Sequence, residues 1–241
     1  MRSSSPARSR RDAGSAGRRP TNPKSLRRSP PFAFFTITIL ALGIGANTAI
    51  FSVVNAVMLR SLPVRAPSEL VHLLSVYPGE PRQPGFPWMA YEHYRDNNHV
   101  FTDLIAVTPA RFDASLDGQN VESIQAQYVS GNFFSALGVR PVLGRLIASQ
   151  DDVVGSPSAA VAVMSWTTWL TRFGGDPRIV GRSVVVDTVP VTIVGVAPAG
   201  FSGVITGYSP ALWLPAAAEA QLDQPSGRAT GGLPVAVVGR L

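Results

Sequence analysis

The sequence predicts an α+β protein, with one N-terminal transmembrane helix followed by a mixed α/β domain in two small lobes. The first observation is an uncharged run of 28 residues, Phe32 to Leu59, which holds no Asp, Glu, Lys, Arg or His. The second is that segments with the two-residue period of strands alternate with short amphipathic segments after Ser61. The third is the abundance of turn residues, with 22 Gly and 21 Pro in 241 residues.

The uncharged run is long enough to cross a bilayer, since a hydrocarbon core of roughly 30 Å needs about 20 apolar residues in a helix. The alternative is a cleaved signal peptide, but its apolar region covers about 7–15 residues and ends at a small-x-small site. No A-x-A site closes this run. A helix over the whole run would extend roughly 42 Å, so we expect it to tilt or to protrude from the membrane.

Residues 1–31 form a basic tail before the run. They hold nine Lys and Arg residues against one acid, Asp12, whereas the net charge of the whole chain is +6. The composition predicts a disordered tail, which the positive-inside rule places in the cytoplasm. Five prolines argue against an organelle transit peptide, and the lack of aromatic residues argues against nucleic-acid binding. Residues after about 60 are then periplasmic, in a bacterium whose inner membrane holds the span.

Small residues recur every four positions in the run, at Ala41, Gly45 and Ala49. This spacing puts them on one helical face, where another helix can approach closely. Polar groups within the run favour a bundle further, because they are costly to leave facing lipid. They are Asn47, Thr48, Ser52 and Asn55. We therefore predict that Ala41, Gly45 and Ala49 are helix-packing residues; the alternative is a lone anchor in which small residues are simply common.

The first half of the domain mixes strand and helix patterns. Apolar runs and period-two alternation indicate strands, and apolar residues at helical spacing indicate helices. The predicted elements are a buried strand at Leu70–Val76, a helix at Trp88–Asn97, a second helical turn at Phe101–Val107, and strands at Phe112–Leu116 and Val121–Val129 joined by a turn at Asp117-Gly118.

The second half contains clearer start and stop signals. Ser or Asn residues stand before apolar helical segments, and Gly residues follow them. The predicted elements are a short helix capped by Ser130 or Asn132 and ended by Gly138, a buried strand at Ala160–Met164, a helix at Trp166–Phe173 between Ser165 and Gly174-Gly175, a hairpin of Ser183–Val186 and Val191–Val196 about Asp187-Thr188, and a final strand at Ala211–Pro215.

No pattern in the chain points to catalysis, a cofactor or a metal. The chain has no Cys, and its His residues (His72, His93 and His99) lack metal-ligand spacing. No P-loop or G-x-S-x-G motif occurs, and Gly43-Ile44-Gly45 lacks the third glycine of a dinucleotide fingerprint. Asp151 and Asp152 are adjacent, so their side chains should point apart into a solvated loop. We expect a protein that is not an enzyme.

Several ordered motifs resemble the MacB/FtsX-like ABC-transporter permeases, particularly their acidobacterial-type duplicated orphan members. The similarity covers roughly Arg27 to the C-terminus and begins in the uncharged run, with Leu40 to Val57, and in Leu59-Arg60-Ser61-Leu62-Pro63. It continues in Ser130 to Val139, Leu143-Gly144-Arg145, Trp169 to Arg182, Val194 to Pro198 with Gly200-Phe201, and Leu212-Trp213-Leu214-Pro215.

The resemblance implies a permease subunit that has no catalytic residues or cofactor of its own. A separate cytoplasmic ATPase subunit and other permease spans would be its partners in the membrane, and a periplasmic protein a further one. It also implies that residues 60–241 are a MacB-like periplasmic core domain. Members normally carry further spans after this domain, and Val237 to Leu241 resemble the start of another motif, so we expect a C-terminally truncated fragment with an unpaired final strand.

Two other classes stay open on the sequence. A single-span membrane receptor would use the outer domain to bind a ligand or protein without transport. A membrane-anchored hydrolase would require that the fold place His93 or His99 beside a carboxylate in a pocket.

Overall fold

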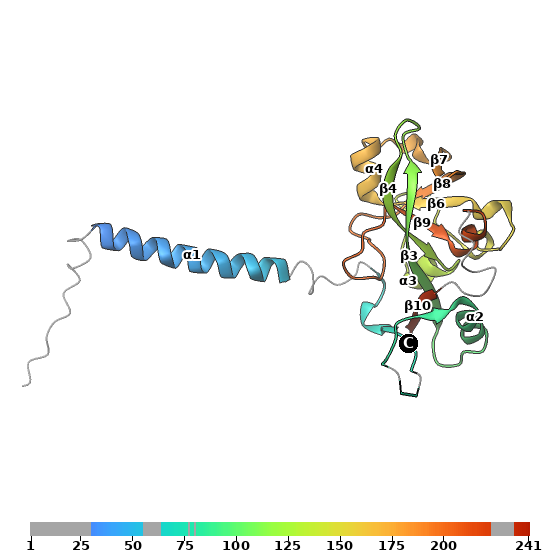
Figure 1. The fold of residues 1–241 in the computed structure, drawn as a ribbon, viewed down its shortest axis with the longest axis horizontal. Helices are drawn as coiled ribbons and strands as arrows, with labels where there is room; N and C mark the ends of the chain where they lie inside the picture. The colour runs from blue at the N-terminus through green and yellow to red at the C-terminus, as the bar shows by residue number, and fades with distance from the viewer. Residues whose placement is uncertain (1–29, 55–63, 77, 80, 223–233) are drawn as a thin grey trace, which may run out of the picture. The chain divides into compact units, whose positions relative to one another are not determined.

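The computed structural model describes residues 30–54, 64–76, 78–79, 81–222 and 234–241, which divide into two units, Met1–Met58 and Leu59–Leu241. α1 (Pro30–Val54) is the described part of the first unit, a single helix of 25 residues (Figure 1). Its stretch Pro31–Ser52 is the one helix among the described residues that is long and apolar enough to cross a bilayer. The helix predicted for the uncharged run is thus confirmed to Val54; the tail to residue 29 and residues 55–59 lie outside the described residues.

The second unit is a mixed α/β domain built on one sheet. Its strands are β1 (Leu70–His72), β2 (Phe86–Pro87), β3 (Asp103–Ser115), β4 (Glu122–Val129), β5 (Leu143–Gly144), β6 (Val161–Met164), β7 (Ser183–Val186), β8 (Val189–Val196), β9 (Leu212–Pro215) and β10 (Pro234–Arg240). The helices are α2 (Trp88–Asp96), α3 (Phe133–Leu137) and α4 (Trp166–Phe173), with 3₁₀ turns η3 (Pro67–Glu69), η4 (Ser149–Asp151), η5 (Pro157–Ala159), η6 (Pro177–Ile179) and η7 (Ala216–Ala220).

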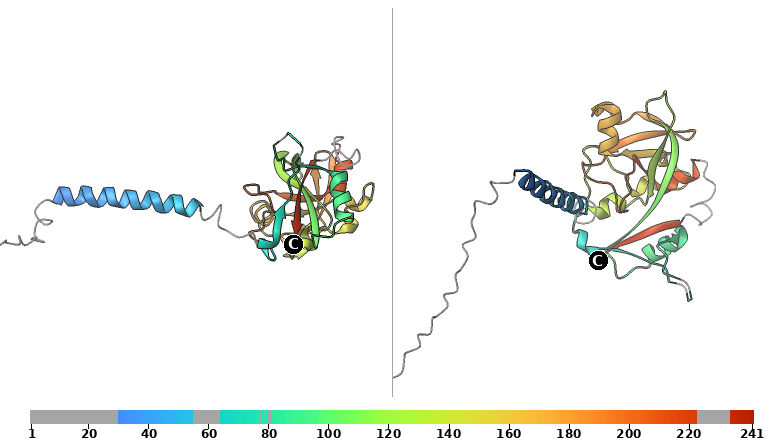
Figure 2. Two further views of the ribbon diagram at one scale, coloured as in Figure 1. Left: turned by 90° about the horizontal axis from the view of Figure 1, so that it is seen from below. Right: turned by 60° about the vertical axis from the view of Figure 1, so that its left-hand side comes forward.

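The long strand β3 connects two groups of elements. Its first residues pair with β10 and its last residues with β7. Pairing runs from β3 through β4, β9, β6, β8 and β7 back to β3, so these strands close a ring. β1 and β2 pair with β10 outside the ring. Figure 1 shows α2 and β10 at one end of the domain and α4, β7 and β8 at the other, and the right-hand view of Figure 2 shows the same separation. Residues Leu59–Leu241 nevertheless form one compact unit, and the division into two small lobes stays a prediction.

Hydrophobic clusters lie on both sides of the sheet. Along β9, Leu212 and Leu214 belong to one cluster, and Trp213 between them belongs to the other, because successive side chains in a strand point to opposite faces. α2 and α4 add Tyr91 and Trp169 to the first cluster, and α3 adds two buried phenylalanines to the second. Both faces of β9 are therefore buried.

Local signals produced the helices and the hairpin that the sequence predicts. The Oγ of Ser165 accepts a hydrogen bond from the N–H of Thr168 at the start of α4, and Gly174 ends the helix at φ +60°. Gly138 ends α3 in the same left-handed conformation, although Asn132 at its start makes no side-chain cap. β7 and β8 form the predicted hairpin about Asp187-Thr188.

The helical turn predicted at Phe101–Val107 is wrong, because β3 begins at Asp103. Leu104 and Ala106 belong to the first hydrophobic cluster, and Ile105 and Val107 belong to the second. A strand buried on both faces is apolar throughout, so it lacks the alternation that distinguishes a strand from a helix.

The buried strand predicted at Leu70–Val76 is shorter and more exposed than expected. β1 ends at His72, and Leu74 and Val76 are 45% and 66% exposed. The reason is the position of β1 at the edge of the sheet, where β10 is its one neighbour among the described strands.

The strand predicted at Ala211–Pro215 is present as β9, but it is not the final strand. β10 follows it and lies between β1 and β3, with β2 also paired to it. The expectation of an unpaired final strand is therefore wrong, since both neighbours of β10 are supplied by earlier parts of the chain.

Candidate functional site

The predicted packing face of α1 is open in the single chain. A Cβ atom built on Gly45 would meet no other heavy atom within 4 Å, and Ala41 and Ala49 are exposed. The hydroxyl of Thr48 donates to the carbonyl of Ile44 at 2.8 Å, so this polar group is satisfied inside the helix. Thr48 by itself is thus not a reason for a helix bundle.

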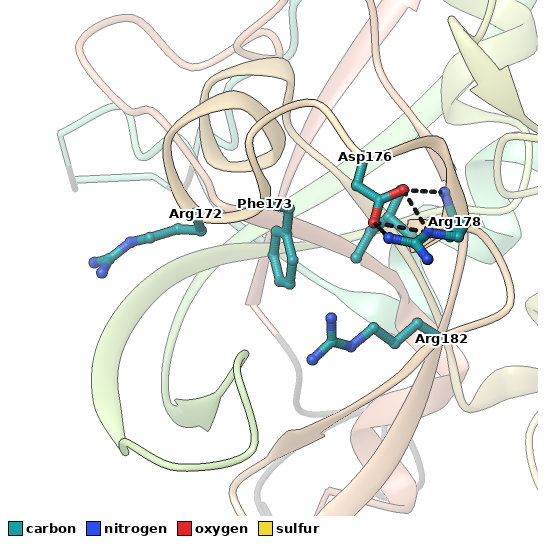
Figure 3. A pocket seen from close by; sticks show the side chains of 6 residues that line it. Arg172, Phe173, Asp176, Arg178 and Arg182 are labelled. Atoms are coloured by element: carbon teal, nitrogen blue, oxygen red, sulfur yellow. Dashed lines mark hydrogen bonds and ion pairs between the residues drawn. The ribbon is translucent and has the colours of Figure 1, made fainter.

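Three arginines surround a hollow of about 490 Å³ between the end of α4 and η6 (Figure 3). The lining residues are Arg172, Phe173, Asp176, Arg178, Ile179 and Arg182. They fall within Trp169 to Arg182, one of the motifs that carry the family resemblance. Phe173 serves two purposes, since it packs against the first hydrophobic cluster and also lines the hollow.

Most of the positive charge around this hollow is neutralised by acids of the same domain. Arg178 donates from Nη2 to Asp176 at 2.8 Å, and these side-chain hydrogen bonds hold the pKa of Asp176 below its ordinary value. Arg172 pairs with Glu122 of β4. The guanidinium of Arg182 lies over the ring of Phe173, as Figure 3 shows, 5.3 Å from its centroid. Two of the three cations that line the hollow therefore already have internal partners.

The family-like segment from Ser130 has a structural role in the domain. The Oγ of Ser130 accepts from the N–H of Ala106 at 3.1 Å and donates to Asn132 at 2.9 Å. Asn132 in turn donates to the carbonyl of Leu104 at 2.9 Å, to which the Tyr91 hydroxyl also donates at 3.3 Å. Burial is the main cause of the raised pKa of Tyr91. This network joins α2, β3 and α3.

Asp151 and Asp152 do not form the solvated loop that the sequence suggests. Asp151 is 1% exposed and pairs with both terminal nitrogens of Arg145, at 2.6 and 2.8 Å. Asp152 accepts from the backbone N–H groups of Gly131 and Ala217, at 2.9 Å each. The two carboxylates point to different partners, as expected, but Asp151 stabilises its own loop and Asp152 joins segments that are distant in the sequence.

The three histidines are exposed on the surface of the domain. Neither His93 nor His99 lines the arginine hollow or a second hollow of about 410 Å³ beside Trp166. Among the described residues, no group of three His, Cys, Asp or Glu side chains is placed to hold a metal ion. Neither of these two hollows therefore supplies the geometry that the hydrolase hypothesis requires.

Comparison with known proteins gives one family. The family described as MacB-like periplasmic core domain matches residues 33–238. The periplasmic region of MacB from Actinobacillus actinomycetemcomitans is similar in structure, with 14% identity, a TM-score of 0.53, and coverage of 71% of this chain and 73% of that one. The extracellular domain of the noncanonic ABC-type transporter YknZ from Gram-positive bacteria is also similar, with 14% identity, a TM-score of 0.50, and coverage of 71% and 81%. No curated protein sequence matches significantly.

Proposed function

The chain belongs to the MacB-like periplasmic core domain family, and we propose that it works as part of an ABC-transporter permease subunit in the inner membrane. The observation that carries this proposal is the extent of the match, which includes most of α1 as well as the domain. A membrane helix joined directly to this domain is the arrangement that a permease needs. The narrower resemblance to acidobacterial-type orphan permeases stays a prediction.

In this role, a separate cytoplasmic ATPase supplies the energy. The 241 residues hold no G-x-x-x-x-G-K-[ST] loop to bind nucleotide phosphates, which is consistent with ATP hydrolysis by this separate subunit. Motion of the spans would then reach the periplasmic domain, which acts on an exported substrate or on a periplasmic protein. A single-span receptor is the alternative, and it would need neither the ATPase nor further spans.

The orientation can be tested with single cysteines, because the chain has none of its own. Ser4→Cys reports on the basic tail and Val121→Cys on the domain, where Val121 is 72% exposed. A membrane-impermeant maleimide should label Val121→Cys in intact cells with permeabilised outer membranes, and Ser4→Cys only after lysis. The opposite pattern would exclude the proposed topology.

The proposed packing face is tested by co-purification with a full-length permease of the same family. Gly45→Leu places a large side chain in the face of Ala41, Gly45 and Ala49, and we expect it to weaken the association. Gly43→Leu is the matched control, because two residues turn the helix by about 200° and put this leucine on the other side. Equal recovery of both variants would contradict the packing face, and an absence of any association would favour the receptor.

A further inference from the structure

Arg240 at the end of β10 is the one cation among the described residues with almost no exposure, at 2%. Its Nε donates to the carbonyl of Ala136 in α3 at 3.0 Å. Its Nη2 donates to the carbonyl of Arg65 at 2.8 Å, and its Nη1 to the carboxylate of Glu69 at 3.1 Å. A buried guanidinium is costly unless its donors are matched, so these three bonds explain how the charge is tolerated.

Two of these acceptors, Arg65 and Glu69, belong to the entry segment, which we define as residues 64–69, the first described residues after α1. Other bonds fasten the same segment at the same place. The N–H of Arg65 donates to the carbonyl of Leu137 at 2.9 Å, and the N–H of Leu241 donates to the carbonyl of Glu69 at 3.1 Å. The entry segment is thus bonded both to α3 and to the end of β10.

The backbone of the entry segment is held in a conformation that few residues adopt. Ala66 has φ +40° and ψ +67°, a left-handed conformation that is unfavourable for a residue with a Cβ atom. Such a conformation persists where the surrounding contacts determine it. A Cβ atom on Gly138 would lie 2.8 Å from the Cβ of Arg65, so α3 ends in the glycine that lets the entry segment approach.

We propose that Arg240 is a positioning residue that transfers tension from the entry segment to the interior of the domain. β1, the strand after this segment, is an edge strand with three residue pairs to β10. If the three residue pairs between β1 and β10 were the sole resistance to tension on the chain before β1, they would open one after another. The Arg240 guanidinium instead connects the entry segment to α3 and to β10, which itself lies between β1 and β3. The proposal rests on the proposed function, in which motion of the spans reaches the domain.

Single-molecule pulling on the full chain in detergent tests this role. In the first geometry, handles attach to cysteines at Val64 and Val121, so that tension enters through the entry segment. We expect wild-type protein to open in one event. In Arg240→Met, residues 64–72, which are the entry segment and β1, should detach first at a force at least twofold lower, releasing roughly 30 Å of chain. Arg178→Met, which removes an exposed guanidinium, is the matched control and should leave the force unchanged.

A second geometry separates this role from general stability. Handles at Val121 and Val154, two exposed residues, do not pull on the entry segment. The proposal is supported if Arg240→Met lowers the unfolding force in the first geometry only. It is overturned if the force falls equally in both geometries, or if it does not fall in the first. If Arg240→Met does not fold, Glu69→Gln weakens one bond at a half-exposed carboxylate and should give a smaller fall in the first geometry alone. These outcomes are independent of the labelling and co-purification experiments, so failure of one proposal is distinguishable from failure of the other.

Discussion

The substitution Gly195→Ala tests the close packing of β5 against β8. The added methyl group would collide with backbone atoms and lower the free energy of unfolding. A Cβ atom at this position would lie 2.0 Å from the carbonyl oxygen of Arg145 and 2.7 Å from that of Leu143. Ordinary van der Waals contact with a Cβ atom begins at 3.4 Å, so the backbone has to separate by about 1.4 Å. Two backbone hydrogen bonds of 2.9 Å hold the strands at their present distance.

The expected loss of stability follows from these contacts. Adding a methyl group to a well-packed site costs about 1–3 kcal/mol, and each weakened hydrogen bond costs about 1 kcal/mol net. The obstacle here is backbone rather than the end of a flexible side chain, so we expect the upper part of this range. The free energy of unfolding should fall by about 3 kcal/mol.

Urea unfolding followed by tryptophan fluorescence is a suitable assay for the full chain in detergent. All four tryptophans lie in the domain, so α1 does not contribute to the signal. Gly85→Ala is the control, since no heavy atom lies within 4 Å of its Cβ position, and its effect should stay within about 0.5 kcal/mol. If Gly195→Ala lost less than about 1 kcal/mol with an unchanged m-value, the close packing of β5 on β8 would be refuted.

Three further predictions concern polar groups of the domain. Ser165→Ala removes the N-cap of α4 and should lower the unfolding free energy by about 1 kcal/mol in the urea assay; no change would contradict the cap. Arg145→Met leaves the buried carboxylate of Asp151 without its cation and should cost about 3 kcal/mol, partly recovered by adding Asp151→Asn. Backbone N–H groups of its own turn lower the pKa of Asp117 to about 2, so its stabilisation is complete above its ordinary pKa near 4 and is lost as the pH falls through 2. The thermal midpoint of Asp117→Asn should therefore fall less between pH 4 and 2 than that of the wild type. Parallel curves of thermal midpoint against pH for the two proteins would exclude this contribution of Asp117.

The elements with local signals could be predicted from the sequence. Ser165 and Gly174 mark the two ends of α4, and their chemistry acts within a few residues of the chain. Trp166, Trp169 and Phe173 follow at helical spacing, and all three pack in or against the first hydrophobic cluster, as their pattern indicates. Such elements depend little on which other part of the chain they contact.

The position of β10 could not be predicted, because strand order is decided by distant residues. Arg240 pairs with Leu70, and nothing near either residue identifies the other. On the sequence alone, Arg240 at the end of this strand would be placed at the surface, because arginine is rarely buried. Its burial requires acceptors from α3 and the entry segment together, and these meet only in the folded domain.

The candidate sites differ in how much the sequence shows. The spacing of Ala41, Gly45 and Ala49 is visible directly, and their role in packing stays a prediction. The arginine hollow depends on the chain turning back after η6, which brings Arg182 over Phe173. A cluster of three arginines within eleven residues is a signal that could have drawn attention to this surface.

In the proposed topology, the placement of β10 also constrains when the domain can fold during its passage across the membrane. β1 emerges about 170 residues before its partner, and the same late strand completes the pairing of the first part of β3. Pairing between residues so far apart makes folding slow, because a long loop has to close first. The sheet therefore completes only after residue 240 has been translocated. Until then β1 and the first part of β3 lack their partner and are open to pairing with other chains, so in the proposed topology periplasmic chaperones that shield strand edges should raise the yield of folded protein.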